Sequence, residues 1–230
     1  MGGGAQGNAG KAAIQARKRQ IRRSMLALRR ELSEAERIAR SGRVAEQLTG
    51  LPCYQRARVI LWYMAFENEV LTAGLIQQAI AAGKWAVLPL VQADRRQLEL
   101  YEIRDVERDV APGYRGIPEP RPERCRPVVA AELELVLVPG VAFDAQGGRL
   151  GFGAGFYDRL LAGLPRDIPK LGMAFDFQVL PQLPRQPHDM TLDGIVMERR
   201  VICCGRLDGE EGAGITARLA DGGRAGERGE

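Results

Sequence analysis

A short glycine-rich stretch, RLGFGAGFYDRLL at residues 149–161, holds the residue types best suited to chemistry. Gly151, Gly153 and Gly155 can adopt backbone angles that other residues avoid, so consecutive N–H groups can point inward around an anion. The helix expected after them adds the positive end of its dipole. Asp158 in its first turn could reach a Mg²⁺ ion bound to a phosphate. The stretch favours a phosphate site, and its spacing alone also fits a plain glycine connector between a strand and a helix.

The glycine spacing differs from two familiar nucleotide motifs. GFGAGF places its last glycine one position too early for a dinucleotide fingerprint, with Phe156 standing where that glycine would be. No Gly-Lys-Ser/Thr follows, so the stretch is not a Walker A loop. The loop therefore needs support from residues elsewhere in the chain.

Histidine and cysteine usage narrows the possible chemistry. The chain has one histidine, His188, which excludes a two-histidine metal site and a histidine relay. Its four cysteines lack zinc spacing and are expected to be reduced thiols. Any catalysis must then use carboxylates, hydroxyls, basic groups, a cofactor or a metal bound by oxygen.

Strand-like and helix-like segments alternate along the chain. Helical spacing predicts helices over residues 14–32, from the capping box of Ser33 and Glu36 to about residue 48, and from Thr72 to Gly83. Apolar or alternating runs predict strands at 57–65, 84–91, 97–103, 133–143, 169–175 and 194–203, with a long loop at 104–131. This alternation predicts one three-layer α/β/α domain with a mainly parallel, Rossmann-like sheet.

Length and composition indicate a single domain within 230 residues. We expect a flexible leader over 1–13, the α/β domain over 14–204 and a disordered tail over 205–230. No apolar run approaches the roughly 20 residues of a membrane helix, and no secretory signal is visible. We expect a cytoplasmic monomer with no membrane or nucleic-acid partner, although the basic stretch 11–30 leaves RNA binding as an alternative.

Five ordered segments carry a specific resemblance. They are KRQIRRSMLALRREL, MAFENEVLT, GYRGIPEP, LVLVPGVAFDAQGGRLGFGAGFYDRLL and GMAFDFQVLPQLPRQPHDMTLDGIV. In this order they resemble the 5-formyltetrahydrofolate cyclo-ligase family, also called methenyltetrahydrofolate synthetases. The resemblance spans about Lys18 to Ile202.

The resemblance implies an ATP- and Mg²⁺-dependent ring closure of a small-molecule substrate, 5-formyltetrahydrofolate, to 5,10-methenyltetrahydrofolate. In the family, the formyl oxygen attacks the γ-phosphate of ATP, N10 attacks the carbon of the resulting iminium phosphate, and phosphate leaves. Phosphorylation makes a poor leaving group into a good one, so the enzyme mainly positions reactants and stabilises charge.

The same resemblance assigns roles to individual residues. The ATP-binding set is Lys18, Arg22, Arg149, Leu150, Gly151, Phe152, Gly153, Ala154, Gly155, Phe156 and Tyr157. The folate-binding set is Phe66, Glu69, Phe152, Gly153, Ala154, Gly155 and Phe156. Tyr157 and Arg149 are the expected catalytic residues, and Asp158 and Asp189 are the expected Mg²⁺ ligands.

Two positions depart from the family pattern. Phe156 stands where the family usually has tyrosine, and Ala154 stands where it often has glycine or lysine. We expect activity to survive, because Tyr157 and Asp158 remain. The enzyme alternative is a related protein that binds a phosphorylated ligand without folate chemistry.

Overall fold

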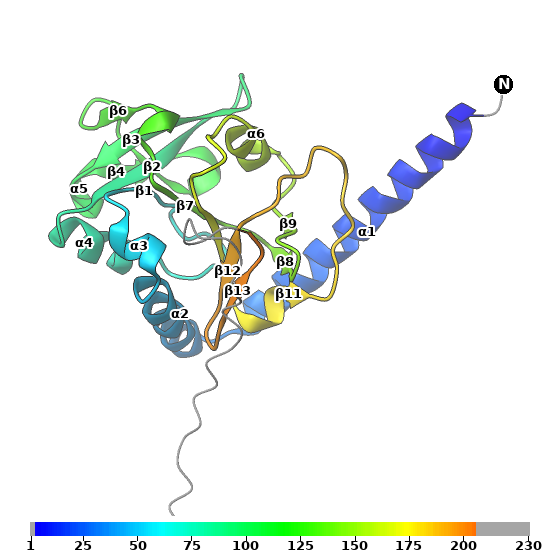
Figure 1. Cartoon of the computed structure of the whole chain (residues 1–230), viewed down its shortest axis with the longest axis horizontal. Helices are drawn as coiled ribbons and strands as arrows, with labels where there is room; N and C mark the ends of the chain where they lie inside the picture. The colour runs from blue at the N-terminus through cyan, green and yellow to red at the C-terminus, as the bar shows by residue number, and fades with distance from the viewer. Residues whose placement is uncertain (1–2, 206–230) are drawn as a thin grey trace, which may run out of the picture.

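The computed structural model describes residues 3–205 of the chain. An eight-stranded sheet lies at its centre (Figure 1). The five strands in the middle of this sheet are parallel, and the outer ones are antiparallel to their neighbours. In order across the sheet, the strands are β13 (Val201–Cys203), β12 (Gly194–Val196), β10 (Lys170–Met173), β7 (Leu135–Val138), β1 (Val59–Leu61), β2 (Trp85–Gln92), β3 (Gln97–Ile103) and β6 (Arg126–Val128). The expected α/β fold with a mainly parallel sheet is confirmed.

Alternating side chains of the sheet form two cores. Ile60, Leu88 and Leu135 face the helices α2 (Glu34–Thr49), α3 (Pro52–Arg56) and α4 (Ala73–Ala81). Leu61 and Val136 point the other way and pack with α6 (Phe156–Ala162). Because successive side chains of a strand point to opposite faces, continuous apolar runs bury both faces of the sheet.

The helix α1 (Gly3–Glu31) lies along a small three-stranded sheet (Figure 1). That sheet consists of β11 (Val179–Leu180), β8 (Ala142–Asp144) and β9 (Arg149–Leu150). Ile21 and Met25 of α1 are buried against residues of this sheet and its flanks. The amino-terminal part of α1 projects beyond the body of the molecule (Figure 1). This packing fixes the carboxyl-terminal half of α1 next to the strand that leads into the glycine loop.

The beginning of α1 differs from the sequence-based expectation. The helix starts at Gly3 rather than near residue 14, so the part of the leader from Gly3 onward is helical. Alanines at positions 12, 13 and 16 are strong helix formers and extend the helix toward the amino terminus. The expected disordered tail lies outside the described residues, apart from Gly205.

Three predicted segments are more divided than expected. The predicted strand 133–143 is β7 and β8 with Pro139 and Gly140 between them, and the strand 194–203 is the antiparallel hairpin of β12 and β13. The predicted loop 104–131 also has structure. It contains α5 (Val106–Asp109), β4 (Val110–Pro112), the 3-10 helices η1 (Tyr114–Gly116) and η2 (Ala130–Glu132), and β5 (Pro118–Pro120) in addition to β6.

Local signals at the helix ends are borne out in part. Ser33 and Glu36 form the expected capping box at the start of α2. Thr72 stands at the start of α4 but does not cap it, because its hydroxyl donates to the Tyr63 carbonyl at 2.6 Å. Gly83 ends this helical segment with a φ of 80°. The Thr72 bond instead ties the start of α4 to the segment that follows β1.

The connections of the parallel strands create a switch point. The chain passes from β1 through α4 to β2 on one side, and from β7 through α6 to β10 on the other. The carboxyl ends of β1 and β7 are therefore neighbours from which the connections diverge. Ligands of open α/β sheets bind in the crevice at such a point.

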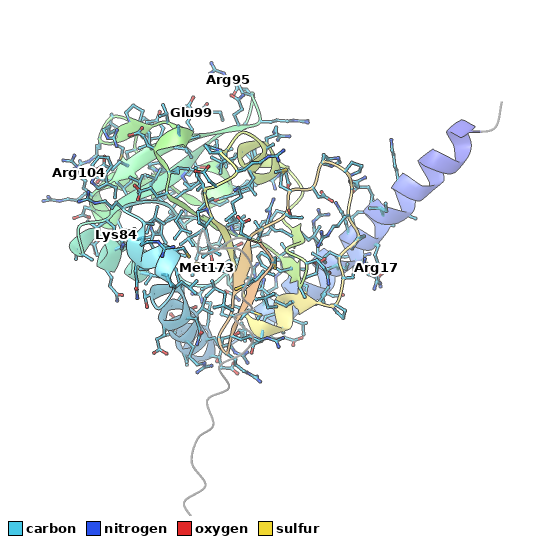
Figure 2. All side chains as sticks on the ribbon, in the orientation of Figure 1. Arg17, Lys84, Arg95, Glu99, Arg104 and Met173 are labelled. Atoms are coloured by element: carbon cyan, nitrogen blue, oxygen red, sulfur yellow. The ribbon has the colours of Figure 1, made fainter. Side chains whose placement is uncertain are left out.

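The antiparallel hairpin of β2 and β3 borders this crevice. Its register runs from Ala86 opposite Ile103 to Gln92 opposite Gln97. Arg95 at the tip points away from the body of the molecule (Figure 2). Within residues 3–205, no helix is both long enough and apolar enough to cross a membrane.

Candidate active site

A cavity of about 660 Å³ opens at the switch point. Its walls come from α1, the segment after β1, β2, the 114–119 segment, the glycine loop with the start of α6, and residues 186–189. The structure brings every candidate residue from the sequence to this one cavity. They are Lys18, Arg22, Phe66, Glu69, Arg149, Leu150, Gly151, Phe152, Gly153, Ala154, Gly155, Phe156, Tyr157, Asp158 and Asp189.

The three loop glycines meet different requirements. Gly153 and Gly155 have φ values of 108° and 71°, which side chains rarely allow. Gly151 is not among the residues with positive φ, contrary to the expectation that all three use this freedom. A Cβ at Gly151 would lie 2.8 Å from Nη1 of Arg149, so this glycine provides space for the guanidinium.

The helix α1 supplies two cations to the cavity. The Lys18 ammonium is 2.5 Å from Oδ2 of Asp189. Arg22 lies one turn further along the same face, and its Nε donates to the Gly151 carbonyl at 2.7 Å. Burial lowers the pKa of Arg22, and the Asp189 carboxylate counters that shift. Lys18 is only 5% exposed, so it does not belong to a free basic surface of the kind that RNA binding would need.

Arg149 and Asp158 form the second ion pair of the cavity. Nη2 of Arg149 donates to Oδ1 of Asp158 at 3.0 Å, and Nη1 donates to the Pro139 carbonyl at 3.3 Å. The guanidinium also lies over the Tyr157 ring, 5.7 Å from its centre. Arg149 is 9% exposed, and its Nε is buried without a hydrogen-bond partner within the described part of the chain. These contacts fix the Arg149 guanidinium between the carboxyl end of β7 and the first turn of α6.

Asp158 and Asp189 suit an oxygen-coordinated cation. Each carboxylate accepts its hydrogen bonds on one oxygen: Oδ1 of Asp158 from Arg149 and Met190, and Oδ2 of Asp189 from Lys18 and the Gln186 N–H. The other oxygen of each carboxylate is the one a metal would use. Mg²⁺ is commonly held by one or two carboxylates together with phosphate oxygens and water. Within residues 10–205, no group of three or more histidine, cysteine, aspartate or glutamate side chains could hold a metal ion.

Glu69 is a buried acid of the cavity, on the segment that follows β1. Its Oε2 accepts a hydrogen bond from the Phe66 N–H at 3.1 Å, and Oε1 lies 3.7 Å from Nη1 of Arg29. Burial raises the pKa of Glu69 to about 7, and the Arg29 guanidinium counters part of that shift. The carboxyl group therefore changes charge near neutral pH.

Two tyrosine hydroxyls accompany Glu69. Burial raises the pKa of both Tyr157 and Tyr63 well above the ordinary value, and the Glu69 charge raises both further. Both hydroxyls remain protonated at neutral pH and can donate hydrogen bonds. Tyr157 lines the cavity at the start of α6, beside Arg149.

Two edge-to-face aromatic pairs join the glycine loop to the other walls. The rings of Phe66 and Phe152 are 6.1 Å apart, and those of Tyr114 and Phe156 are 5.8 Å apart. Arg159 secures the same loop by donating to the Ala154 carbonyl at 2.8 Å and to the Arg96 carbonyl at 2.7 Å. The loop is thus held on both sides of Gly153, which lies in its middle.

Several residues that line the cavity are not among those that the sequence motifs mark. Tyr114 and Glu119 belong to GYRGIPEP, a segment that carries the resemblance and could have been examined for them. Gln15, Arg96, Arg159 and Gln186 also line the cavity, without any local pattern that distinguishes them. His188 lines it too, although its side chain is 74% exposed and its Nε2 is 4.0 Å from Asp189.

The fold and the cavity define a class of protein. A Rossmann-like sheet with buried cations, paired carboxylates and a glycine loop at its switch point is typical of α/β proteins that bind a phosphorylated ligand. Residues 14–198 match the model of the 5-formyltetrahydrofolate cyclo-ligase family. The chain belongs to this family, and the resemblance seen in its sequence is confirmed.

Individual relatives are similar over most of their length. The 5-formyltetrahydrofolate cyclo-ligase of Mycolicibacterium smegmatis is 29% identical over 188 residues, which cover 80% of this chain and 95% of the relative. The solved 5,10-methenyltetrahydrofolate synthetase of Aquifex aeolicus has a TM-score of 0.73 and 31% identity, covering 89% of this chain and 98% of its own. The Mycoplasma pneumoniae synthetase gives a TM-score of 0.65 at 26% identity, covering 79% and 98%.

Proposed function

We propose that this protein converts 5-formyltetrahydrofolate to 5,10-methenyltetrahydrofolate with ATP as co-substrate and releases ADP and phosphate. Family membership supports the overall conversion. The observation that carries the proposal for ATP is the convergence of Lys18, Arg22 and Arg149 with the glycine loop in one cavity. We expect the enzyme to act as a cytoplasmic monomer.

The nucleotide belongs on the side of α1 and the glycine loop. Lys18, Arg22 and Arg149 offer three cationic groups there, and charge-assisted hydrogen bonds to phosphate are the strong ones. Their present partners are Asp189, the Gly151 carbonyl and Asp158. On ATP binding, we propose that the phosphates take over part of these bonds.

Asp158 and Asp189 would hold a Mg²⁺ ion through their free carboxylate oxygens. When bound, the ion supplies positive charge that neutralises the phosphate oxygens during transfer. Lys18 and Arg149 orient the two carboxylates, because each of them contacts the other oxygen of its partner.

The folate belongs on the side of Phe66 and Glu69. The Glu69 carboxylate can accept hydrogen bonds from the N–H groups of a pterin ring. Phe66 and Phe152 provide an apolar aromatic wall beside it. In this arrangement the formyl group would lie between the nucleotide side and the folate side of the cavity, close to the glycine loop.

The reaction then follows from positions and charges. The formyl oxygen attacks the γ-phosphorus of ATP, the bond to the bridging oxygen breaks, and ADP leaves. N10 next attacks the formyl carbon, its proton departs, and the carbon–oxygen bond breaks to release phosphate. We propose that Arg149, which lies over the Tyr157 ring, stabilises the phosphoryl group during transfer, and that the protonated Tyr157 hydroxyl donates to developing negative charge. No histidine base is required.

A coupled assay tests the proposal. Purified protein is incubated with Mg²⁺, ATP and 5-formyltetrahydrofolate, and the absorbance of the methenyl product is followed together with ADP release. We expect both signals only when all three components are present. ATP binding without any folinate-dependent product would favour the alternative protein that binds a phosphorylated ligand but lacks folate chemistry.

A further inference from the structure

Arg29 is a buried cation that the proposed reaction does not use. It is 0% exposed, although its neighbour Arg30 on α1 is exposed. Lys18, Arg22 and Arg29 are spaced by four and seven residues, so they share one face of the helix. At 1.5 Å per residue, Arg29 lies about 16 Å along the axis from Lys18. One helix therefore reaches from the proposed phosphate side of the cavity to the proposed folate side.

The Arg29 side chain donates hydrogen bonds to two residues of the segment 66–69 and forms an ion pair with a third. Its Nη2 donates to the Phe66 carbonyl at 2.9 Å, and its Nε donates to the Glu67 carbonyl at 3.0 Å. Its Nη1 faces Oε1 of Glu69 at 3.7 Å. The Arg29 carbonyl accepts a hydrogen bond from Nδ2 of Asn68 at 3.0 Å, which ties in the remaining residue.

The backbone of this segment is strained. Glu67 and Asn68 have φ values of 43° and 60°, so two consecutive residues other than glycine are left-handed. This backbone conformation is unfavourable for residues that carry a Cβ atom, and it persists only where the surrounding structure holds it. The fork of hydrogen bonds from Arg29 holds it here. The turn directs the Phe66 ring to Phe152 and the Glu69 carboxylate into the cavity.

The charged ends of Arg29 and Glu69 are incompletely bonded. Nη1 of Arg29 and Oε1 of Glu69 are both buried, and neither has a hydrogen-bond partner in the described part of the chain. A buried ion pair without its full set of hydrogen bonds is costly. Because Glu69 lines the cavity, a ligand that donates to its carboxylate would supply the hydrogen bond that the acid lacks.

We propose that Arg29 is a positioning residue of the active site, which holds the 66–69 turn so that Phe66 and Glu69 meet the folate substrate. This inference rests on the proposed function. It predicts that Arg29 acts mainly on folate binding, because the contacts of Lys18 and Arg22 do not involve the turn, although the Arg29 guanidinium also lies 5.9 Å from the centre of the Phe152 ring in the glycine loop.

Three variants test the inference: Arg29→Met, Arg29→Lys and, as the matched control on the same helix, Arg30→Met. Calorimetry measures folinate binding without ATP, and separately ATP binding without folinate. For Arg29→Met we expect the folinate Kd to rise roughly 10- to 100-fold, the scale on which loss of an outer-shell partner lowers affinity or activity in metal sites. We expect ATP affinity to stay within about 2-fold. Arg30→Met should match the wild type for both.

Arg29→Lys separates the charge from the hydrogen-bond fork. Lysine keeps a cation near Glu69 but cannot bond to two carbonyls in the planar geometry of arginine. We expect its folinate affinity to lie between those of the wild type and Arg29→Met. If Arg29→Met does not fold in a circular dichroism control, the lysine variant alone decides, with weaker folinate binding and unchanged ATP binding as the supporting result.

The outcomes distinguish the inference from the proposed function. Equal weakening of both substrates, or an unchanged folinate Kd in the Arg29 variants, overturns the positioning role. Failure of the wild-type protein to bind folinate at all counts against the proposed function, and the inference falls with it.

Discussion

The buried carboxyl group of Glu69 predicts a specific dependence of stability on pH. Burial in the folded protein raises its pKa from 4.5 to about 7, so the folded state binds this proton more tightly than the unfolded state. The resulting stabilisation is complete below pH 4.5 and is lost as the pH rises through about 7. At about 1.4 kcal/mol per pH unit, the difference amounts to about 3 kcal/mol in the free energy of unfolding.

Glu69→Gln removes this contribution, because the amide does not titrate. Urea unfolding followed by circular dichroism, from about pH 4.5 to about pH 8, gives the free energy of unfolding of each protein. Other carboxyl groups titrate equally in both, so the difference between their pH profiles isolates Glu69. We expect the wild type to lose about 3 kcal/mol more than the variant over this interval.

Parallel pH profiles for the two proteins would refute this reasoning. They would mean that the Arg29 guanidinium compensates the burial fully and keeps Glu69 ionised. If the wild type instead gained stability relative to the variant as the pH rises, folding would lower the pKa of Glu69 rather than raise it. Either result would mean that Glu69 meets the substrate as a negatively charged carboxylate at neutral pH.

Three further substitutions test other parts of the structure. Asp158→Ala should lower Mg²⁺-dependent turnover by about 100-fold or more while the circular dichroism spectrum persists; full turnover would exclude a metal role. Gly147→Ala should destabilise the fold by about 2 kcal/mol or more, because φ is 77° and the new Cβ would lie 2.3 Å from the Leu192 carbonyl oxygen. Gly42→Ala, in the exposed middle of α2 with nothing within 4 Å, should stabilise it by about 1 kcal/mol. Urea midpoints measure both glycine variants, and a stable Gly147→Ala protein would contradict the close approach.

Local sequence patterns predicted the elements in which the spacing of apolar and capping residues matches the structure that they form. The strands at 84–91 and 97–103 and the capping box of Ser33 were found this way, because their patterns match the period of the structure. The short strands β4 and β5 were missed because Pro112, Pro118 and Pro120 argue against strands, and only their mutual pairing forms them. Similarly, Thr72 has the type of a cap, but a tertiary partner competes for its hydroxyl.

The cavity was predictable to the extent that sequence motifs mark it. The glycine loop and the resemblance named residues that the fold brings together. Arg29 was missed because it lies among basic residues that look like a solvated helix face. Its spacing of four residues from the buried Met25 was the available signal. Its partners are the carbonyls of Phe66 and Glu67, which no sequence pattern identifies.

The central claim is that the formyl oxygen of the folate receives the γ-phosphoryl group of ATP in this cavity. The most direct measurement uses folinate that carries a heavy oxygen isotope in its formyl group, with mass spectrometry of the inorganic phosphate released. We expect the phosphate to contain the heavy oxygen, in an amount equal to the methenyl product. Phosphate without the label, or product formed without ATP, would contradict it.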